Sequence, residues 1–228
     1  MHSNENNLQI LFEDNHLIVI NKRCGDIVQG DKTGDTPLNE VVKSYIKKKY
    51  NKPGAVFLGT VHRLDRPTSG VVIYAKTSKA LERMNKQFRD KAISKTYWAL
   101  IPKGKIPEHG HLEDYLVKNP KNNKSQSTNK DRKGAKLAVL NYRKIHDFDR
   151  YQLLDIDLET GRHHQIRVQL SERGAPIKGD LKYGSPRSNP DAGISLHARK
   201  IEFTHPVTKE HMEITAAVPP NKIWDKIK

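Results

Sequence analysis

Asp65 lies between Arg63 and Arg66 in a stretch, residues 61–70, that reads VHRLDRPTSG and continues into five apolar residues. Nearby guanidinium groups favour the charged form of a carboxylate, so Asp65 is expected to stay ionised at neutral pH. An ionised carboxylate is suited to act as a nucleophile or a base rather than as a proton donor. The turn at residues 68–70 would hold it on a rigid edge. Asp65 is therefore the candidate reacting group.

A second polar segment, residues 159–168, reads ETGRHHQIRV and predicts a strand end, a Thr-Gly turn and the start of a helix. Arg162 and Arg167 fall near this helix start, where backbone N–H groups and the helix dipole favour an anion. The planar guanidinium also suits bidentate pairing with a carboxylate. The alternative is an ordinary charged helix face with Ile166 and Leu170 packed inward.

Tyr97 belongs to a third segment, KTYWA at residues 95–99, whose alternating pattern predicts a strand. Most aromatic residues on strands are core residues. Tyr97 is therefore a candidate site residue only in combination with the other two segments.

The charge balance of the 228 residues indicates a polyanionic partner. There are 41 Lys and Arg against 26 Asp and Glu, a formal net charge of +15, and the sequence pI is about 9.8. Such an excess favours nucleic acid first and an acidic membrane surface second. A soluble protein that merely happens to be basic is the remaining alternative.

Cys24 is the only cysteine, which excludes an internal disulfide and a zinc site built from cysteines. The polar N-terminus lacks the apolar core of a signal peptide, and no stretch is long enough to span a membrane. We expect a cytoplasmic protein that forms one domain over residues 1–228.

The periodicity of the chain predicts an α+β fold, with a mixed, largely antiparallel sheet as the core and flanking helices. Thr36 is expected to cap a first helix that begins at Pro37. Further helices are expected at 78–90 and 163–173, and strands at 8–12, 17–20, 70–76, 95–101, 136–145, 151–159, 196–204 and 211–218.

The segment 118–134 contains six Lys and Arg and no apolar side chain except that of Pro120. Because such a segment has little to bury, we expect a mobile basic loop. It is either a solubilising surface or an arm that contacts RNA.

Taken together, these segments resemble the RluA family of pseudouridine synthases. The motifs that carry the resemblance follow the family's order along nearly the whole chain: Glu13–Lys22, His62-Arg63-Leu64-Asp65 through Ser69-Gly70, Lys95-Thr96-Tyr97, Thr160-Gly161-Arg162-x-His164-Gln165-Ile166-Arg167, Pro176-Ile177-x-Gly179-Asp180 and Leu196-His197-Ala198. The chain resembles a compact member of the family without an accessory RNA-binding domain in front.

This resemblance implies isomerisation of uridine to pseudouridine in structured RNA, with no cofactor and no metal. It makes Asp65 the essential carboxylate, which either attacks the ribose or acts as a base. Tyr97 would stack on the flipped uracil, and Arg167 would pair with Asp65 and orient it. Further residues expected to bind the substrate are His62, Arg63, Arg162 and Gln165.

The expected partner is transfer RNA, ribosomal RNA or both, bound by a monomer that needs no protein partner and no membrane. The pair Arg66-Pro67 slightly favours transfer RNA. One alternative is a catalytically silent RNA-binding protein that keeps the fold. Another is a metal-dependent hydrolase, which would use scattered histidines that lack a metal-binding spacing: His62, His163, His164, His197 and His205.

Overall fold

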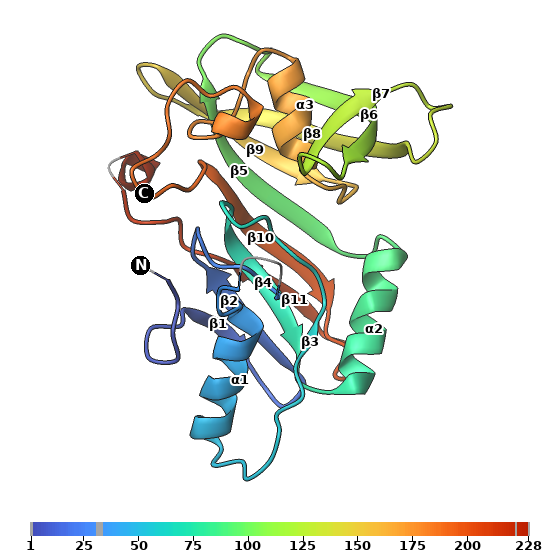
Figure 1. The fold of residues 1–228 in the computed structure, drawn as a ribbon, viewed down its shortest axis with the longest axis vertical. Helices are drawn as coiled ribbons and strands as arrows, with labels where there is room; N and C mark the ends of the chain where they lie inside the picture. Colours follow the sequence, from blue (N-terminus) through green and yellow to red (C-terminus); the bar gives the residue numbers. More distant parts are fainter. Residues whose placement is uncertain (1, 31–33, 222, 228) are drawn as a thin grey trace. The chain divides into compact units, whose positions relative to one another are not determined.

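The computed structural model describes residues 2–30, 34–221 and 223–227 (Figure 1). Contacts between residues divide the chain into two compact units. Unit 1 comprises the chain up to Ile93 together with Ala198–Lys226, and unit 2 comprises Ser94–His197 and Ile227. The expectation that residues 1–228 form one domain stays a prediction.

Unit 1 is a small sheet with a helix on each face. Its elements are β1 (Ile10–Glu13), β2 (Leu17–Lys22), α1 (Leu38–Lys49), β3 (Gly59–Thr60), β4 (Ser69–Ala75), α2 (Ser78–Arg89), most of β10 (Leu196–Thr204), β11 (His211–Thr215) and most of the 3-10 turn η2 (Trp224–Ile227). The strand order is β1-β2-β4-β10, with β3 paired to β4 and β11 paired to β10.

Alternate residues of β2 and β4 enter two different cores, because successive side chains of a strand point to opposite faces. Leu17 and Val19 of β2 pack in the core that contains Met84 of α2. Ile18 and Ile20 pack in the core that contains residues of α1. The two helices therefore cover opposite faces of this sheet, and β4, whose seven residues are all buried, crosses the middle of unit 1.

Unit 2 is an antiparallel sheet crossed by a short helix. Its elements are β5 (Ser94–Pro102), β6 (His109–Asn119), β7 (Lys124–Thr128), β8 (Lys136–Asp147), β9 (Tyr151–Leu158), α3 (Gln165–Glu172) and the 3-10 turn η1 (Leu181–Tyr183). The strand order is β5-β9-β8-β6-β7, and every neighbouring pair is antiparallel. Ile166 and Leu170 of α3 pack against Ala99, Leu140 and Leu154 of the sheet.

The expected α+β class with a largely antiparallel sheet is confirmed, as are the hairpin of β1 and β2 and the strands β4, β5, β8, β9 and β10. Two helix starts were wrong. Helix α1 begins at Leu38 with Pro37 in the N-cap position, and no side chain caps it. Helix α3 begins at Gln165 because His164 adopts a left-handed backbone conformation (φ 55°), which interrupts helical geometry.

The expectation of a loop throughout 118–134 is wrong for residues 118–119 and 124–128. The end of β6 pairs with β7 here, from Tyr115 opposite Thr128 to Asn119 opposite Lys124. The pattern was missed because β7 contains no apolar side chain, and Ser125 is its buried residue. Mobility of this segment stays a prediction.

Within the described ranges, no helix is both long enough and apolar enough to cross a membrane.

Candidate active site

The loop that contains Asp65 is a tight turn leading into β4. The backbone N–H of Thr68 donates to the carbonyl of Asp65 at 3.0 Å, which closes the turn. Asp65 is half-buried, whereas residues 68–70 are buried. The reacting group proposed from the sequence therefore lies immediately before a buried central strand, and this gives the turn a rigid support.

Gly70 permits the loop to enter β4. Its φ is +115°, and a Cβ atom added there would lie 2.2 Å from the carbonyl oxygen of Ala198. Only glycine adopts this backbone conformation without strain, and only a residue without a side chain fits against the Ala198 backbone.

We expect Gly70→Ala to lower the free energy of unfolding by about 2–4 kcal/mol, since backbone strain and overpacking add. Urea unfolding followed by circular dichroism would measure this loss. Gly104→Ala is the matched control, because Gly104 also has a positive φ (+71°) but has nothing within 4 Å of an added Cβ. If both variants lower the free energy of unfolding equally, the contact with Ala198 contributes nothing to the effect of Gly70→Ala.

Lys22, at the end of β2, binds the backbone of the loop that contains Asp65. The side chain is 1% exposed, and its Nζ donates to the carbonyl oxygens of Arg23 at 2.9 Å and Arg66 at 3.1 Å. Burial lowers the pKa of Lys22 to about 8, although the negative charge of Asp65 is among the charges that raise it. A buried cation thus lies in the electrostatic field of the candidate carboxylate.

The two arginines beside Asp65 are both exposed. Arg66 pairs with Asp35, with Nη2 2.7 Å from Oδ2, and its carbonyl accepts hydrogen bonds from Lys22 and from the backbone of Gly25. Arg63 forms no ion pair within the described residues. Arg66 therefore helps to fasten the loop, whereas the guanidinium of Arg63 remains available to an anion.

His62 is tied to unit 1 by its ring. Its Nε2 accepts a hydrogen bond from the backbone N–H of Ile73 at 3.1 Å. The ring also stacks on that of Phe88, with centroids 5.0 Å apart. These contacts fix the start of the Asp65 loop against β4 and α2; a contact of His62 with substrate stays a prediction.

Tyr97 lies on β5, opposite Ile156 of β9, and its half-buried ring packs against the core of unit 2. The predicted strand is confirmed. The strand holds the tyrosine on a rigid element, as a stacking partner for a base requires.

Two neighbouring side chains of unit 2 hold Arg167. Its guanidinium forms a bidentate pair with Asp180, with Nε 2.7 Å from Oδ2 and Nη2 2.9 Å from Oδ1. The guanidinium carbon also lies 5.0 Å from the centroid of the Tyr183 ring. Both charged side chains are almost fully buried, at 5% and 1% exposure. Asp180 and Tyr183 therefore orient Arg167, and the expected pairing of Arg167 with Asp65 stays a prediction.

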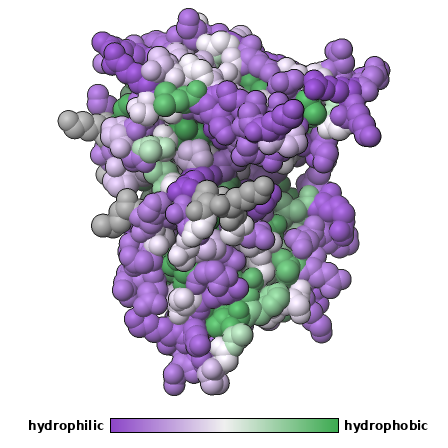
Figure 2. Space-filling model, in the orientation of Figure 1, coloured by the Kyte–Doolittle hydropathy of each residue, from purple (hydrophilic) through white to green (hydrophobic). Residues whose placement is uncertain are grey.

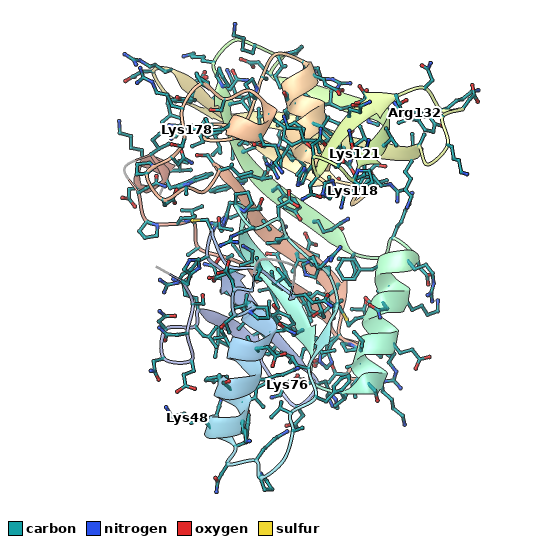
Figure 3. All side chains as sticks on the ribbon, viewed as in Figure 1. Lys48, Lys76, Lys118, Lys121, Arg132 and Lys178 are labelled. Carbon is teal, nitrogen blue, oxygen red and sulfur yellow. The ribbon has the colours of Figure 1, made fainter. Side chains whose placement is uncertain are left out.

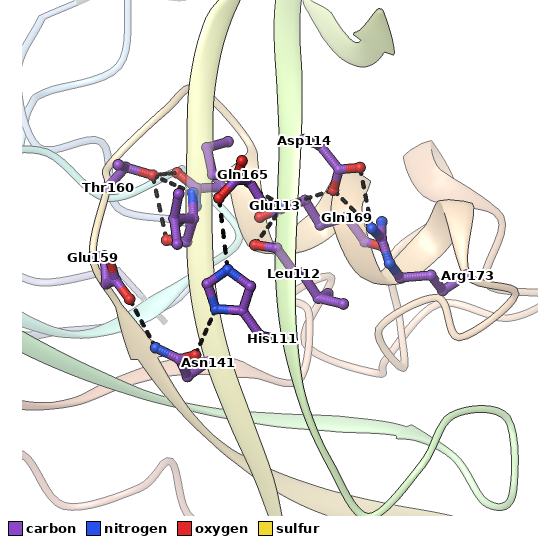
Figure 4. A network of polar contacts seen from close by, with 12 residues as sticks. His111, Leu112, Glu113, Asp114, Asn141, Glu159, Thr160, Gln165, Gln169 and Arg173 are labelled. Atoms are coloured by element: carbon purple, nitrogen blue, oxygen red, sulfur yellow. Dashed lines mark hydrogen bonds and ion pairs between the residues drawn. The ribbon is translucent and has the colours of Figure 1, made fainter.

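Gln165 holds the turn that precedes α3 (Figure 4). Its Oε1 accepts from the Thr160 hydroxyl at 2.8 Å and from the backbone of Arg162 at 3.0 Å, and its Nε2 donates to the Val139 carbonyl. The Nε of Arg162 donates to the carbonyl of Leu137 at 2.7 Å. The amide of Gln165 is thus buried and committed to the fold, and its role toward substrate stays a prediction.

A second buried amide, that of Gln169, attaches α3 to β6. Its Nε2 donates to Asp114 at 2.7 Å, and Asp114 also pairs with Arg173 (Figure 4). These bonds fix the rotation of α3 about its axis and therefore the direction in which Arg167 leaves the helix.

His164 completes a buried network around Arg167. Its Nδ1 is 2.8 Å from the hydroxyl of Tyr183, and its ring stacks on that of His163 with centroids 3.7 Å apart. Burial lowers the pKa of His164 to about 2, and the positive charges of Arg167, His163, Lys182 and Lys118 lower it further. His164 is therefore a neutral side chain in a strongly electropositive region.

The predicted site residues fall in both units. Asp65, Arg63 and His62 belong to unit 1, whereas Tyr97, Arg162, Gln165 and Arg167 belong to unit 2. Their assembly into one site stays a prediction. Within the part of the chain that the structure describes, His, Cys, Asp and Glu side chains form no group of three or more suited to hold a metal ion.

Three functional candidates carry no assigned role in the sequence analysis: Lys22, Asp180 and Tyr183. Lys22 and Asp180 lie within the quoted motifs, but nothing in the sequence shows which backbone or side-chain atoms they contact. Tyr183 lies outside those motifs, and no pattern in the sequence distinguishes it from other tyrosines.

Comparison with known proteins identifies a family. A family model described as RNA pseudouridylate synthase matches residues 16–172. "Ribosomal large subunit pseudouridine synthase D" of Zymomonas mobilis is 32% identical over 222 residues, which cover 93% of this chain and 69% of the relative. "Ribosomal large subunit pseudouridine synthase C" of Vibrio vulnificus is 34% identical over 213 residues, covering 91% and 64%. The chain thus spans about two thirds of the length of these relatives.

Among solved structures, the human protein "RNA Pseudouridylate Synthase Domain Containing 4" is similar with a TM-score of 0.78 and 24% identity. The similarity covers 95% of this chain and 90% of the human chain, and it shows that the two share a fold.

Proposed function

This chain belongs to the RNA pseudouridylate synthase family, and we propose that it isomerises uridines in RNA with Asp65 as the essential carboxylate. The observation that carries the proposal is the family match over residues 16–172, which contains Asp65, Tyr97 and Arg167. The alternative of a catalytically silent RNA-binding protein is not favoured, because all three residues are present.

The reaction breaks the bond from ribose to the base nitrogen and joins the ribose to a ring carbon of the same uracil. Asp65, as an ionised carboxylate, would either attack the ribose or act as a base. We propose that Arg167 keeps this carboxylate ionised and oriented, and the bidentate bond of Arg167 to Asp180 supports a positioning role. Because Asp180 and Tyr183 already hold the guanidinium, it loses little conformational freedom when it binds a further partner.

Tyr97 is proposed to stack on the uracil after it leaves the helical stack and to take part in proton transfer. Extraction of a base costs a few kcal/mol, which contacts to phosphate groups offset. Residues proposed to bind the nucleotide or its phosphates are His62, Arg63, Arg162 and Gln165. The exposed guanidinium of Arg63 supports this role most directly.

The RNA substrate is proposed to be that of the large ribosomal subunit. The named bacterial relatives carry that assignment in their names, which favours ribosomal over transfer RNA for this chain. We propose that the protein acts as a monomer in the cytoplasm, without an obligatory protein partner, cofactor or metal.

Release of tritium from RNA labelled at carbon 5 of uracil tests this proposal. We expect release from an unmodified transcript of large-subunit ribosomal RNA and little or none from a transfer-RNA pool. Release from transfer RNA alone would overturn the proposal that ribosomal RNA is the substrate. No release from either RNA by folded wild-type protein would overturn the activity.

We expect Tyr97→Phe to fold and to bind RNA but to release tritium about 10²-fold more slowly, which is the usual contribution of a proton-transferring group. Single-turnover rates at saturating protein would separate this loss from weaker binding. Tyr151→Phe, which changes a tyrosine on β9 of the same sheet, should keep the wild-type rate. A Tyr97→Phe rate equal to that of wild type would limit Tyr97 to stacking.

A further inference from the structure

Residues 118–136, here called the basic hairpin, comprise the end of β6, β7 and the connection to β8. They contain seven basic residues, all exposed, and Asp131 as their one acidic residue. The basic residues are Lys118, Lys121, Lys124, Lys130, Arg132, Lys133 and Lys136. Figure 3 shows Lys118 and Lys121 near the paired strands and Arg132 in the loop that follows them. Figure 2 shows that hydrophilic residues dominate the surface at this end of unit 2.

The charges of the basic hairpin differ from several lysines of unit 1 in their partners. Within the described ranges, none of the seven forms an ion pair. In unit 1, Lys48 pairs with Glu5, and Lys49 and Lys76 both pair with Glu13. A cation without a protein carboxylate can neutralise a phosphate and release its counterion, whereas a paired cation must first give up its partner. The basic hairpin therefore presents an uncommitted positive surface.

Side-chain hydrogen bonds hold the basic hairpin against unit 2. Ser125 and Ser127 point to the same face of β7, since they are two residues apart. The backbone N–H of Ser125 donates to the Tyr183 hydroxyl at 2.8 Å, and its hydroxyl contacts His163. The N–H of Ser127 donates to Glu172 at 2.9 Å, and its hydroxyl donates to the same carboxylate. Strand β7, whose one basic residue is Lys124, is thus fastened to η1 and α3, and this gives the paired part of the basic hairpin a defined position.

The basic hairpin is also continuous with the surroundings of Arg167. Tyr183 contacts the Arg167 guanidinium on its ring face and Ser125 through its hydroxyl. Lys124 Nζ lies 5.9 Å from the centroid of the same ring, and Lys182 donates to the carbonyl of Asn123 at 3.3 Å. The low pKa of His164, caused first by burial and then by surrounding positive charges, agrees with a concentration of cations here.

We propose that the basic hairpin is a preformed surface that binds RNA phosphates and positions the substrate relative to Arg167. The inference rests on the proposed function, which supplies RNA as the polyanion. An acidic membrane fits less well, because the exposed residues of the hairpin include no large apolar side chain to insert. A fastened strand also loses less conformational entropy on binding than a mobile loop would.

The test compares two full-length variants with the same loss of charge. The hairpin variant combines Lys121→Gln, Lys130→Gln, Arg132→Gln and Lys133→Gln. The control variant combines Lys47→Gln, Lys48→Gln, Lys79→Gln and Lys86→Gln on the exposed surfaces of α1 and α2. Each lowers the formal net charge from +15 to +11 (15 − 4). The dissociation constant of an unmodified large-subunit ribosomal RNA fragment is measured at several salt concentrations.

We expect the hairpin variant to bind at least about 10-fold more weakly at 0.1 M salt, with a salt dependence of log Kd that is shallower by about 2–4, because up to four phosphate contacts are lost. The control variant should change the affinity by less than about threefold. Equal losses in both variants would overturn the proposal, because net charge alone would then account for binding. Wild-type affinity of the hairpin variant would overturn it as well.

Ser127→Ala tests the fastening without changing a charge. It removes the hydroxyl that bonds Glu172, so we expect a Kd about two- to fivefold weaker with an unchanged salt slope. Wild-type affinity of this variant would overturn the preformed character of the surface. Tritium release by wild-type protein is measured in the same preparations. Its absence would count against the proposed function, whereas the binding results decide the role of the basic hairpin.

Discussion

We expect Asp65→Asn to lower the rate of tritium release from RNA by at least about 10⁴-fold, the scale observed when the reacting group of an enzyme is removed. The substitution keeps the size of the side chain and removes only its charge and nucleophilicity. The closing bond of the turn joins backbone atoms of Thr68 and Asp65, so the loop should keep its shape. Single-turnover assays at saturating protein would measure the loss directly.

The same variant should bind RNA with at least wild-type affinity, because it removes a negative charge from a surface that meets phosphates. Asp35→Asn is the matched control: Asp35 is an exposed carboxylate that pairs with Arg66, the neighbour of Asp65. We expect this control to retain activity within about twofold, since an exposed ion pair contributes little. Tritium release by Asp65→Asn at the wild-type rate would refute the assignment of the reacting group.

Arg167→Ala should abolish measurable turnover and also lower the free energy of unfolding by about 3–5 kcal/mol, because it leaves the carboxylate of Asp180 buried without its partner. The stability loss follows from contacts within unit 2, where the guanidinium bonds Asp180 and lies over Tyr183. Urea unfolding, monitored by a probe of unit 2 such as the fluorescence of Trp98, would measure it.

Two further variants separate the stability of the pair from its function. Arg143→Ala breaks a pair with Asp155 in the same unit, but Arg143 is 73% exposed. This variant should therefore lower the free energy of unfolding by at most about 1 kcal/mol. Replacing both partners, as Arg167→Met with Asp180→Leu, should recover most of the stability because no buried charge remains unpaired. This double variant should stay inactive. Activity in it would show that Arg167 has no role in the reaction.

The candidate reacting group could be predicted from the sequence because its signal is local. The spacing of Asp65, its flanking arginines and the following apolar run all lie within 15 residues. The same holds for the strands β2 and β4 and for the helix α2, whose capping residue Thr77 accepts a bond from Ala80. Hydrophobic period and turn residues are properties of neighbours along the chain, and they largely determine such elements.

The partners of buried charges could not be predicted in the same way. The resemblance implied Asp65 as a partner of Arg167, and this stays a prediction; the bidentate bond of Arg167 to Asp180 had no signal in the sequence. Lys22 and Arg66 are 44 positions apart, and their contact depends on the pairing of β2 with β4. A long polar side chain reaches several possible partners, and only the packing of the surrounding elements selects among them.

The sequence by itself therefore determined the family, the α+β class and the identity of the candidate residues. Ordered motifs and hydrophobic periodicity are local, so they can be recognised without knowing which residues are in contact. Only the tertiary structure decided that Gln165 holds a turn, that Asp180 and Tyr183 orient Arg167, and that 118–134 contains a fastened strand. Strand β7 forms because β6 offers a free edge and Tyr183 and Glu172 bind its serines. Tyr183 and Glu172 lie more than 40 residues from the serines that they bind, so no local pattern in the sequence indicates these bonds.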